Sequence, residues 1–380
     1  MTLPSKLPSV GLTIFTEMTN LANAHGAINL AQGFPEFDPH PLLQELVLKH
    51  MRAGRNQYAP MQGVPALREM IAQKARDLYQ AAYDPATEIT VTAGATEALF
   101  AAVSAVVHPG DEVIILEPAY DCYIPMVVLN GGRPVFVPLS HPSYCVDWDA
   151  FRRRITPRTR LAILNFPHNP SGSILAARDI ETLADILRDT RILLLSDEVY
   201  EHIVFDGRSH ISLCEHPELR ARSFVVSSFA KTYHATGWKV GYCLAPRPLS
   251  AEFQKVHQYL VFSVNAPVQH AFADFMQERS HAAGLAAHYQ TLRDLLLDRL
   301  AASRFRPLAC RGTFFLMLDY SALSDEPDVA FARRLTREHG VAAIPPSVFY
   351  HNGLDHRLLR VCFAKTPDAL NEAAERLCRI

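Results

Sequence analysis

Several features are missing from the sequence, and each absence narrows the class of protein. No apolar run approaches the roughly 20 residues that a membrane-spanning helix needs, so we expect no membrane partner. The first residues, Met1 to Lys6, lack the apolar core and the cleavage pattern of a signal peptide. The seven cysteines are scattered and contain no Cys-x-x-Cys pair, which is typical of reduced thiols and predicts neither a metal site nor a disulfide framework. We therefore expect a cytoplasmic protein.

A strong excess of either charge is also missing. The formal net charge is −2, which gives no reason to expect nucleic acid or an anionic membrane surface as a partner. No internal repeat and no low-complexity segment interrupts the chain. Its 380 residues are enough for one large domain with a smaller one beside it.

From residue 88 onward, predicted strands alternate with predicted helices. The strands are continuous runs of leucine and β-branched residues rather than alternating patterns, which favours a parallel sheet covered by helices on both faces. The sequence therefore predicts an α/β fold whose large domain has a mostly parallel, seven-stranded sheet. The predicted strands are Glu88–Thr92, Glu112–Leu116, Val135–Pro138, Leu161–Asn165, Arg191–Ser196, Phe224–Val226 and Val240–Leu244.

The two ends of the chain differ from this middle part. Residues 1–40 are rich in Gly and Pro, and we expect them to be irregular apart from a short strand near Ile28. From about residue 280 the pattern changes to a long helix, three strands and a closing helix that begins after Thr366. We predict a large domain over 41–279 and a smaller α+β domain built from 1–40 and 280–380.

Polar residues with useful chemistry follow the predicted strands. In an open α/β sheet the carboxyl ends of the strands share one edge, and ligands bind there. This placement predicts a ligand site at that edge. The residues are Thr96, Tyr120, Asn169, Asp197, Tyr200 and Lys231.

Lys231 lies in the stretch Ser227–Lys239, which we expect to be a loop between two buried strands. Hydroxyl groups and aromatic rings surround it in sequence, which suits an amine that forms a Schiff base. Such an amine must lose its proton near neutral pH, and burial or a second cation such as Lys239 would help it do so. The alternative is a loop with two solvated lysines. In the same way, the small residues at Ala95 and Thr96 predict either an anion site at a helix start or a simple cap.

Taken in order, these motifs resemble the pyridoxal-phosphate aminotransferases of fold type I. The resemblance covers nearly the whole chain and is strongest with the methionine, kynurenine and glutamine aminotransferase branch. Ala230 is a departure, since most relatives have Gly before the lysine. The motifs are Ala93–Ala98, Asn169-Pro170, Asp197–Tyr200, Ser228-x-x-Lys231 and Arg360.

The resemblance implies a role for each residue around the cofactor ring. Lys231 would bind pyridoxal phosphate covalently and then move the proton, while Asp197 would keep the ring nitrogen protonated. Tyr200 and Asn169 would hydrogen-bond the phenolic oxygen of the ring, and Tyr120 would stack on its face.

The phosphate and the assembly follow from the same resemblance. Backbone N–H groups of Ala95 and Thr96, with Ser228 and Lys239, would hold the phosphate. Tyr58 would reach that phosphate from a partner subunit, so we expect a homodimer with shared active sites.

The substrates are an amino-acid donor and a 2-keto-acid acceptor. Arg360 would clamp the substrate α-carboxylate, helped by Asn169 and the backbone at Gly33. The expected side-chain pocket, formed by Thr13 to Phe15, Tyr58 and the partner's copy of residues 262–265, offers no Arg or Lys. Because an unpaired buried charge is costly, we predict methionine and aromatic donors, with glutamine and kynurenine as further candidates, rather than aspartate.

Three other functions fit parts of this pattern. A carbon–sulfur β-lyase acting on cysteine conjugates would use the same fold and the same lysine. A regulatory protein with an aminotransferase-like domain would carry a DNA-binding extension, for which we expect no room before residue 30. A catalytically inactive binding protein is disfavoured by the presence of Lys231, Asp197 and Arg360.

Overall fold

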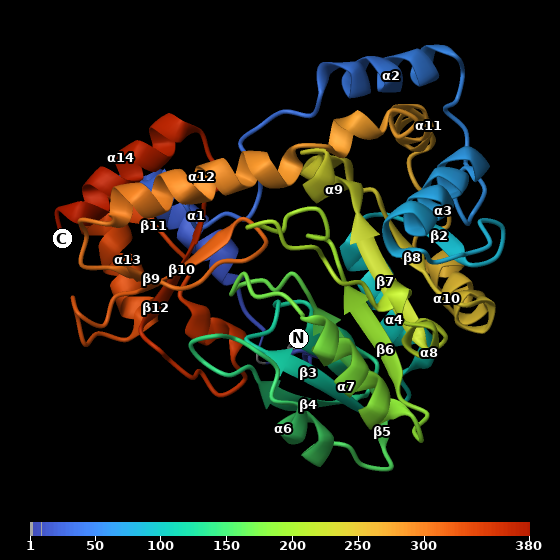
Figure 1. Cartoon of the computed structure of the whole chain (residues 1–380), viewed down its shortest axis with the longest axis horizontal. Coiled ribbons are helices and arrows are strands. Elements are labelled where there is room, and N and C mark those ends of the chain that lie inside the picture. Colours follow the sequence, from blue (N-terminus) through green and yellow to red (C-terminus); the bar gives the residue numbers. More distant parts are fainter. Residues whose placement is uncertain (1–2, 9) are drawn as a thin grey trace.

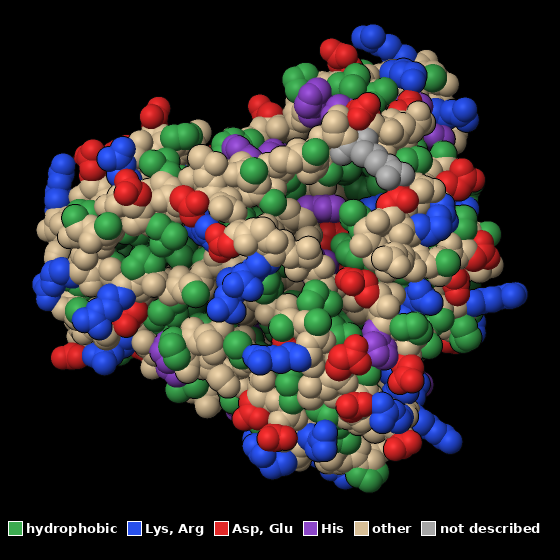
Figure 2. All heavy atoms as spheres, in the orientation of Figure 1, with side chains coloured by type: hydrophobic (Ala, Val, Ile, Leu, Met, Phe, Trp, Pro, Cys, Tyr) green, Lys and Arg blue, Asp and Glu red, His purple; other side chains and the backbone are tan. Residues whose placement is uncertain are grey.

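The computed structural model describes residues 3–8 and 10–380, without the side chain of Arg279. Figure 1 shows two lobes: a large sheet with its helices, and a smaller lobe that contains both α1 and the last helix of the chain. In the part of the chain that is described, no helix is long and apolar enough to cross a membrane. Acidic and basic side chains alternate over the face seen in Figure 2.

The large sheet has seven strands in the order β2-β8-β7-β6-β5-β3-β4, which confirms the predicted fold class. β8 runs antiparallel to both of its neighbours, and the other pairs are parallel. The strand bounds are β2 Ile89–Thr92, β3 Glu112–Glu117, β4 Arg133–Pro138, β5 Thr159–Asn165, β6 Leu193–Asp197, β7 Ser223–Ser228 and β8 Gly241–Leu244.

Helices cover both faces of this sheet because successive side chains of its central strands are buried on opposite sides. Ile114 packs into one hydrophobic cluster with the helices α3, α7 and α11, and Ile115 packs into another with α4, α5 and α10. The six helices are α3 Pro65–Tyr79, α4 Ala95–Val106, α5 Tyr123–Leu129, α7 Ala177–Leu187, α10 Arg247–Leu260 and α11 Ala266–Phe275.

A third hydrophobic cluster forms the core of the smaller lobe and joins the two ends of the chain. Met18 and Ala22 from α1 pack there with Leu296 from α12 and Leu370 from α14. β1 pairs in parallel with β11, and β12-β10-β9 form an antiparallel sheet. A smaller α+β unit built from both chain ends is thus present, while domain limits at residues 40 and 279 stay a prediction. Its elements are α1 Ile14–His25, β1 Ile28–Asn29, α12 Leu285–Leu300, β9 Arg306–Pro307, β10 Phe315–Asp319, α13 Asp328–His339, β11 Val341–Ala342, β12 Leu358–Cys362 and α14 Pro367–Cys378.

Shorter helices complete the chain. Thr366 caps α14 through a hydrogen bond from the Ala369 N–H, with Pro367 in the first helical position, as the sequence predicted. The remaining helices are α2 Pro41–Arg52, α6 Trp148–Arg153, α8 Pro217–Arg220, α9 Phe229–Thr232 and the 3₁₀ turns η1 Leu213–Glu215, η2 Thr236–Trp238, η3 Arg279–Ala282 and η4 Pro346–Phe349.

Two local predictions were wrong. The first forty residues are not irregular, because α1 begins after Thr13, whose hydroxyl accepts the Thr16 N–H, and ends at Gly26 in the left-handed region. Lys231 is not in a loop but in the one-turn helix α9, which Ser228 caps by accepting the Ala230 N–H. The two-residue strand β9 was not predicted at all.

Candidate active site

A cavity of about 310 Å³ opens at the carboxyl edge of the large sheet, and the smaller lobe forms part of its wall. Every predicted site residue except Tyr58 lines this cavity. They are Phe15, Gly33, Ala95, Thr96, Tyr120, Asn169, Asp197, Tyr200, Ser228, Lys231, Lys239 and Arg360.

Lys231 projects from α9, directly after the carboxyl end of β7. Its Nζ donates a hydrogen bond to the Gly33 carbonyl at 2.9 Å and lies 5.2 Å from the centre of the Phe314 ring and 5.7 Å from that of Tyr200. Burial lowers the pKa of Lys231 to about 8, and the cation of Arg360 acts in the same direction. A substantial fraction of the amine is therefore neutral near physiological pH.

Asp197 is the last residue of β6, one strand away from Lys231. Its Oδ2 accepts the Tyr123 hydroxyl at 2.7 Å, and its Oδ1 accepts the Val199 N–H at 3.4 Å. Burial raises the pKa of Asp197 to about 6, while the hydrogen bond from Tyr123 opposes that rise. A cation placed beside this carboxylate would favour its ionised form further.

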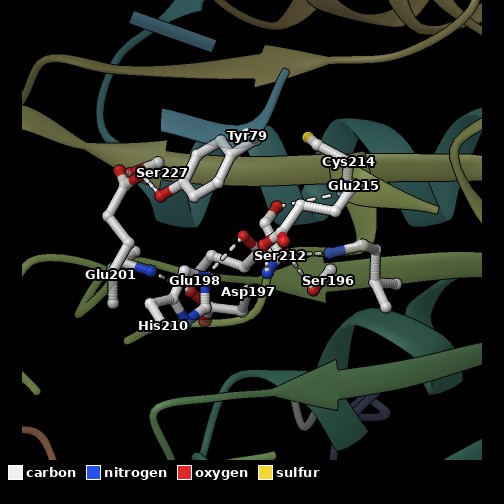
Figure 3. A network of polar contacts seen from close by, with 12 residues as sticks. Tyr79, Ser196, Asp197, Glu198, Glu201, His210, Ser212, Cys214, Glu215 and Ser227 are labelled. Atoms are coloured by element: carbon white, nitrogen blue, oxygen red, sulfur yellow. Dashed lines mark hydrogen bonds and ion pairs between the residues drawn. The ribbon is translucent and has the colours of Figure 1, made fainter. Parts of the chain in front are cut away.

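Behind these two residues, Glu201 ties the ends of β6 and β7 together (Figure 3). Its carboxylate accepts hydrogen bonds from Lys74 at 2.5 Å, from the Tyr79 hydroxyl at 2.5 Å and from the Ser227 hydroxyl. Although burial opposes it, the Lys74 ammonium lowers the pKa of Glu201 well below its ordinary value. The charge is thus fully paired, and it fixes the strand that leads into α9.

Glu198 forms a second buried anchor in the same view. It accepts the Ser196 hydroxyl at 2.8 Å, the His210 Nε2 at 2.8 Å and the Leu213 N–H at 3.1 Å. Because Glu198 follows Asp197 directly, these contacts hold the end of β6 and the direction of the Asp197 side chain.

The start of α4 lines one end of the cavity, and this end suits an anion. No side chain caps α4 among the described residues, so the first N–H groups of this helix, from Ala95 and Thr96, are available at the cavity wall. Gly94 has a φ of +80°, and a Cβ there would lie 3.2 Å from the Nζ of Lys239. A cation and free N–H groups thus meet at one helix end, which is what a phosphate requires.

Gly241 lets the start of α4 approach β8 this closely. A Cβ at this position would lie 2.9 Å from three backbone atoms, the nitrogen of Ala95, the carbonyl carbon of Gly94 and the oxygen of Ser227. Real Cβ atoms do not approach backbone this closely, so a larger residue would push the helix end away.

Arg360 forms the opposite end of the cavity, and it is 1 % exposed. Its Nη1 donates to Asn169 Oδ1 at 2.9 Å and its Nη2 donates to the Ala31 carbonyl at 2.9 Å. Its Nε has no hydrogen-bond partner among the described residues. Burial lowers the pKa of Arg360 to about 10, so the guanidinium stays charged and has donors left for a carboxylate.

Aromatic rings surround Arg360. Its Cζ lies 4.0 Å from the centre of the Phe315 ring and 5.1 Å from that of Phe15. A Cβ at Gly33 would lie 2.8 Å from the Phe315 ring, so glycine lets the backbone at this position approach that ring. Of the predicted segment Thr13 to Phe15, only Phe15 lines the cavity.

Tyr58 lies away from this cavity, at the surface of the chain. Its side chain is 83 % exposed, and its ring packs edge to face against Phe262 with centroids 5.4 Å apart. A role for Tyr58 in a partner's site therefore stays a prediction.

The sequence did not reveal several residues of the site. Tyr123 is the first residue of α5 and lies three residues after Tyr120, and its closeness to that aromatic residue in the sequence was an available clue. Asn165 ends β5, so the same strand-end rule could have found it, and it donates to the Asp197 carbonyl at 2.9 Å. Phe34 and Phe315 line the cavity from segments whose pattern gave no indication.

The residues present fit pyridoxal phosphate. Along one wall lie an uncapped helix end with a lysine for the phosphate, a partly neutral lysine for the aldehyde and a buried carboxylate for the ring nitrogen. Arg360 still has N–H donors that could bind the carboxylate of a substrate, as a transfer of an amino group between two acids requires.

Comparison with known proteins agrees with this geometry. Residues 25–377 match the family model for aminotransferases of class I and II. The chain is 53 % identical to the methionine aminotransferase of Escherichia coli over 98 % of this chain and 97 % of the relative, and 34 % identical to mouse kynurenine–oxoglutarate transaminase 1 over 98 % and 96 %. A solved E. coli structure with a methionine aminotransferase function superimposes with a TM-score of 0.98 at 52 % identity, covering 100 % of both chains.

Proposed function

The chain belongs to the class I and II aminotransferases, which use pyridoxal phosphate, and we propose that it moves the amino group of methionine and of aromatic amino acids to a 2-keto acid. The observation that carries the donor preference is the aromatic lining of the cavity: Phe15 and Phe315 lie beside Arg360, and Phe34 lines the same cavity. The methionine and kynurenine activities of the relatives support it.

Pyridoxal phosphate supplies, when bound, an aldehyde that accepts the amino group and a ring that stores electrons. Lys231 would hold the aldehyde end, and its amine would take the proton from the substrate α-carbon and return it. Its lowered pKa, about 8, suits a group that must both accept and donate a proton near neutral pH. Its hydrogen bond to Gly33 keeps Nζ close to the substrate end of the cavity.

Asp197, Tyr200 and Asn169 set the charge around the ring. The Asp197 carboxylate would keep the ring nitrogen protonated, and the hydroxyl of Tyr123 orients that carboxylate. Burial raises the pKa of Tyr200, so its hydroxyl remains a donor. The Oδ1 of Asn169 is taken by Arg360, which leaves its Nδ2 group to donate.

Arg360 binds the α-carboxylate of either substrate, and its position fixes the α-carbon near Lys231. The ring of Phe315 beneath it and the carbonyl of Ala31 hold the guanidinium in one orientation before substrate arrives. Less conformational freedom is then lost on binding.

Among the described residues that line the cavity, the cations are Lys231, Lys239 and Arg360, and each is already assigned. An aspartate side chain would bury a second carboxylate without a partner, which is costly. A flexible thioether or an aromatic ring instead packs against the phenylalanines. Apolar contacts separate similar side chains by only about 1–3 kcal/mol, so we expect several donors rather than one.

The test is kcat/KM for a panel of amino donors with one fixed 2-keto acid. Methionine, phenylalanine, tyrosine, glutamine and kynurenine should all exceed aspartate. If aspartate equals or exceeds methionine, the donor assignment is wrong. Cysteine conjugates without any keto acid form a separate arm, in which pyruvate release would reveal β-lyase chemistry.

We also propose that the working unit is a homodimer in the cytoplasm. The exposed aromatic residues Tyr58 and Phe262, whose rings pack together, support a second copy on this face, since large exposed apolar side chains that gather mark interaction sites. All seven cysteines are free thiols, which supports a reducing compartment.

A further inference from the structure

A buried histidine lies between the phosphate end of the cavity and the loop that carries Tyr58. The side chain of His257, on α10, is 0 % exposed. Its Nδ1 lies 3.0 Å from Oε1 of Glu97, and its Nε2 lies 2.9 Å from the Met61 carbonyl oxygen. Neither His257 nor Glu97 lines the cavity, so the proposed reaction has no direct use for them.

The hydrogen bonds of this pair require a shared proton. The Met61 carbonyl can only accept, so Nε2 of His257 carries a hydrogen. In a neutral imidazole the Nδ1 would then be an acceptor facing Glu97, and a carboxylate is also only an acceptor. One further proton therefore lies between the two side chains, either on the ring or on the carboxyl. With that proton in place, the two side chains form a hydrogen bond instead of placing two acceptors against each other.

On one side, this link holds the start of α4. Glu97 is in the first turn of the helix, two residues after Ala95, and its Oε2 accepts the Ala93 N–H at 3.1 Å. It thus connects the backbone before and after Gly94 to His257. This is the segment that we assign to the phosphate.

On the other side, His257 holds the surface that faces the proposed partner. Its backbone carbonyl accepts the N–H groups of Val261 and Phe262 at 3.0 and 3.1 Å. Its ring holds Met61, three residues after Tyr58, and the Ser263 hydroxyl joins this same loop by donating to the Ala59 carbonyl at 3.0 Å. Tyr58 and Phe262 therefore both depend on the position of one residue.

We propose that His257 is a positioning residue that couples phosphate binding at α4 to the loop carrying Tyr58, and so to the neighbouring active site. The proposal rests on the proposed dimer and cofactor. When a phosphate fixes the first turn of α4, Glu97 and His257 also become fixed. The mobility of residues 56–63 then falls, because His257 holds the Met61 carbonyl. Cofactor loading in one subunit then orders the loop that completes the other site.

The chain offers a matched pair of variants. Glu97→Gln keeps every contact without the shared proton, because its amide can donate to neutral Nδ1 and its oxygen can accept the Ala93 N–H. His257→Leu removes the link and leaves the Glu97 carboxylate buried and unpaired. If His257→Leu does not fold, His257→Gln serves instead, since one amide nitrogen cannot reach both acceptors at opposite edges of the ring.

The first measurement is hydrogen exchange of the peptide spanning residues 56–63, with and without pyridoxal phosphate. In the wild type and in Glu97→Gln, exchange should slow when the cofactor is added. In the His257 variant, exchange should be equal with and without cofactor. The dissociation constant of the cofactor, measured by absorbance, should rise about tenfold or more in that variant, as expected when a buried polar group loses its partner.

Mixed dimers test the effect between subunits. A chain carrying both His257→Leu and Lys231→Ala is paired with a wild-type chain, so that the site under study has an intact α4 and receives only Tyr58 from the altered chain. We expect weaker cofactor binding in that site than when the partner carries Lys231→Ala alone. Equal binding would overturn the coupling.

Other outcomes are equally decisive. A loop that responds to cofactor normally in the His257 variant, or that fails to respond in the wild type or in Glu97→Gln, overturns the proposal. Those results would leave the proposed function intact, because the donor panel and the subunit mass of the wild-type protein test it independently.

Discussion

Burial changes the ionisation of two side chains in the cavity, Lys231 and Asp197. A lysine in water holds its proton up to a pH of about 10.4, and an aspartate loses its proton near 3.9. Burial disfavours the charged form of both, so it lowers the pKa of Lys231 to about 8 and raises that of Asp197 to about 6. Both groups then titrate close to neutral pH, where proton transfer is most useful.

Lys231 should therefore show its lowered pKa when it captures the cofactor. Only the neutral amine reacts with an aldehyde, so the capture rate of cofactor-free protein should rise with pH up to about 8 and level off above it. The measurement is the absorbance change after mixing with pyridoxal phosphate between pH 6 and 10. A free lysine analogue is the control, since its rate should keep rising through this range. A protein midpoint above pH 10 would contradict the prediction, as would cofactor fixed by borohydride to a residue other than Lys231.

Asp197→Asn keeps the shape of the side chain and removes its charge. The cofactor should still bind, but turnover should fall by two or more orders of magnitude, since buried electrostatic contributions of this kind are commonly about 3–4 kcal/mol. Tyr123→Phe is the matched control, because it removes only the hydrogen bond to Asp197 and should cost far less. Near wild-type kcat in Asp197→Asn would refute the role.

Among the helices and strands, the contact between α4 and β8 sets the position of the proposed phosphate site. α4 begins after a glycine in the left-handed region, and its first turn lies directly over Gly241. The helix end supplies the free N–H groups of this part of the site, and Lys239 supplies a cation beside them.

Gly241→Ala should displace that helix end, because its Cβ would lie 2.9 Å from backbone atoms of Gly94, Ala95 and Ser227. We expect the dissociation constant of the cofactor to rise about tenfold or more and the melting temperature to fall, since overpacking typically costs about 1–3 kcal/mol. Gly237→Ala is the control, since nothing lies within 4 Å of its added Cβ. Equal cofactor binding in both variants would show that α4 tolerates displacement.

In the whole molecule, the exposed face around Tyr58 and Phe262 is where we expect the second copy of the proposed dimer. Tyr58 is 83 % exposed although it is an aromatic residue in a loop held by several hydrogen bonds. An ordered loop that presents a tyrosine to solvent is explained most simply by a partner that covers it.

Mixing two inactive chains should restore activity if that partner shares its site. A Lys231→Ala chain and a Tyr58→Phe chain together form one site that lacks both changes. Activity should therefore exceed the sum of the separate chains and reach about a quarter of wild type, because random pairing makes half of the dimers mixed and each mixed dimer has one intact site of two. Mixing Lys231→Ala with Asp197→Asn is the control, because both residues belong to the same site in one chain and neither mixed site is intact. Fully active monomers in light scattering at assay concentration would rule out shared sites.

The sequence alone determined the large sheet and the residues along its edge. Continuous apolar runs specify buried parallel strands, and a parallel sheet brings its carboxyl ends together, so Asp197, Asn169 and Lys231 had to share an edge. The cap at Thr366 was equally local, since a hydroxyl residue followed by proline is typical of a helix start.

The sequence also contained helix-end signals for α1, although residues 1–40 were predicted to be irregular. Thr13 and Gly26 mark the two ends of α1, but a stretch with many Gly and Pro residues around it hid them. α1 packs against α13 and β11, and this tertiary contact stabilises a helix that the composition of its neighbourhood did not favour.

Only the tertiary structure decided the contacts that join distant segments. Glu97 and His257 are 160 residues apart, and Arg360 and Asn169 are 191 apart, so no periodicity or spacing relates them. The burial that shifts the pKa of Lys231 likewise comes from the whole fold, because the rings of Phe314 and Tyr200 arrive from other strands and loops. Sequence patterns describe neighbours along the chain, whereas desolvation and the pairing of buried charges depend on neighbours in space.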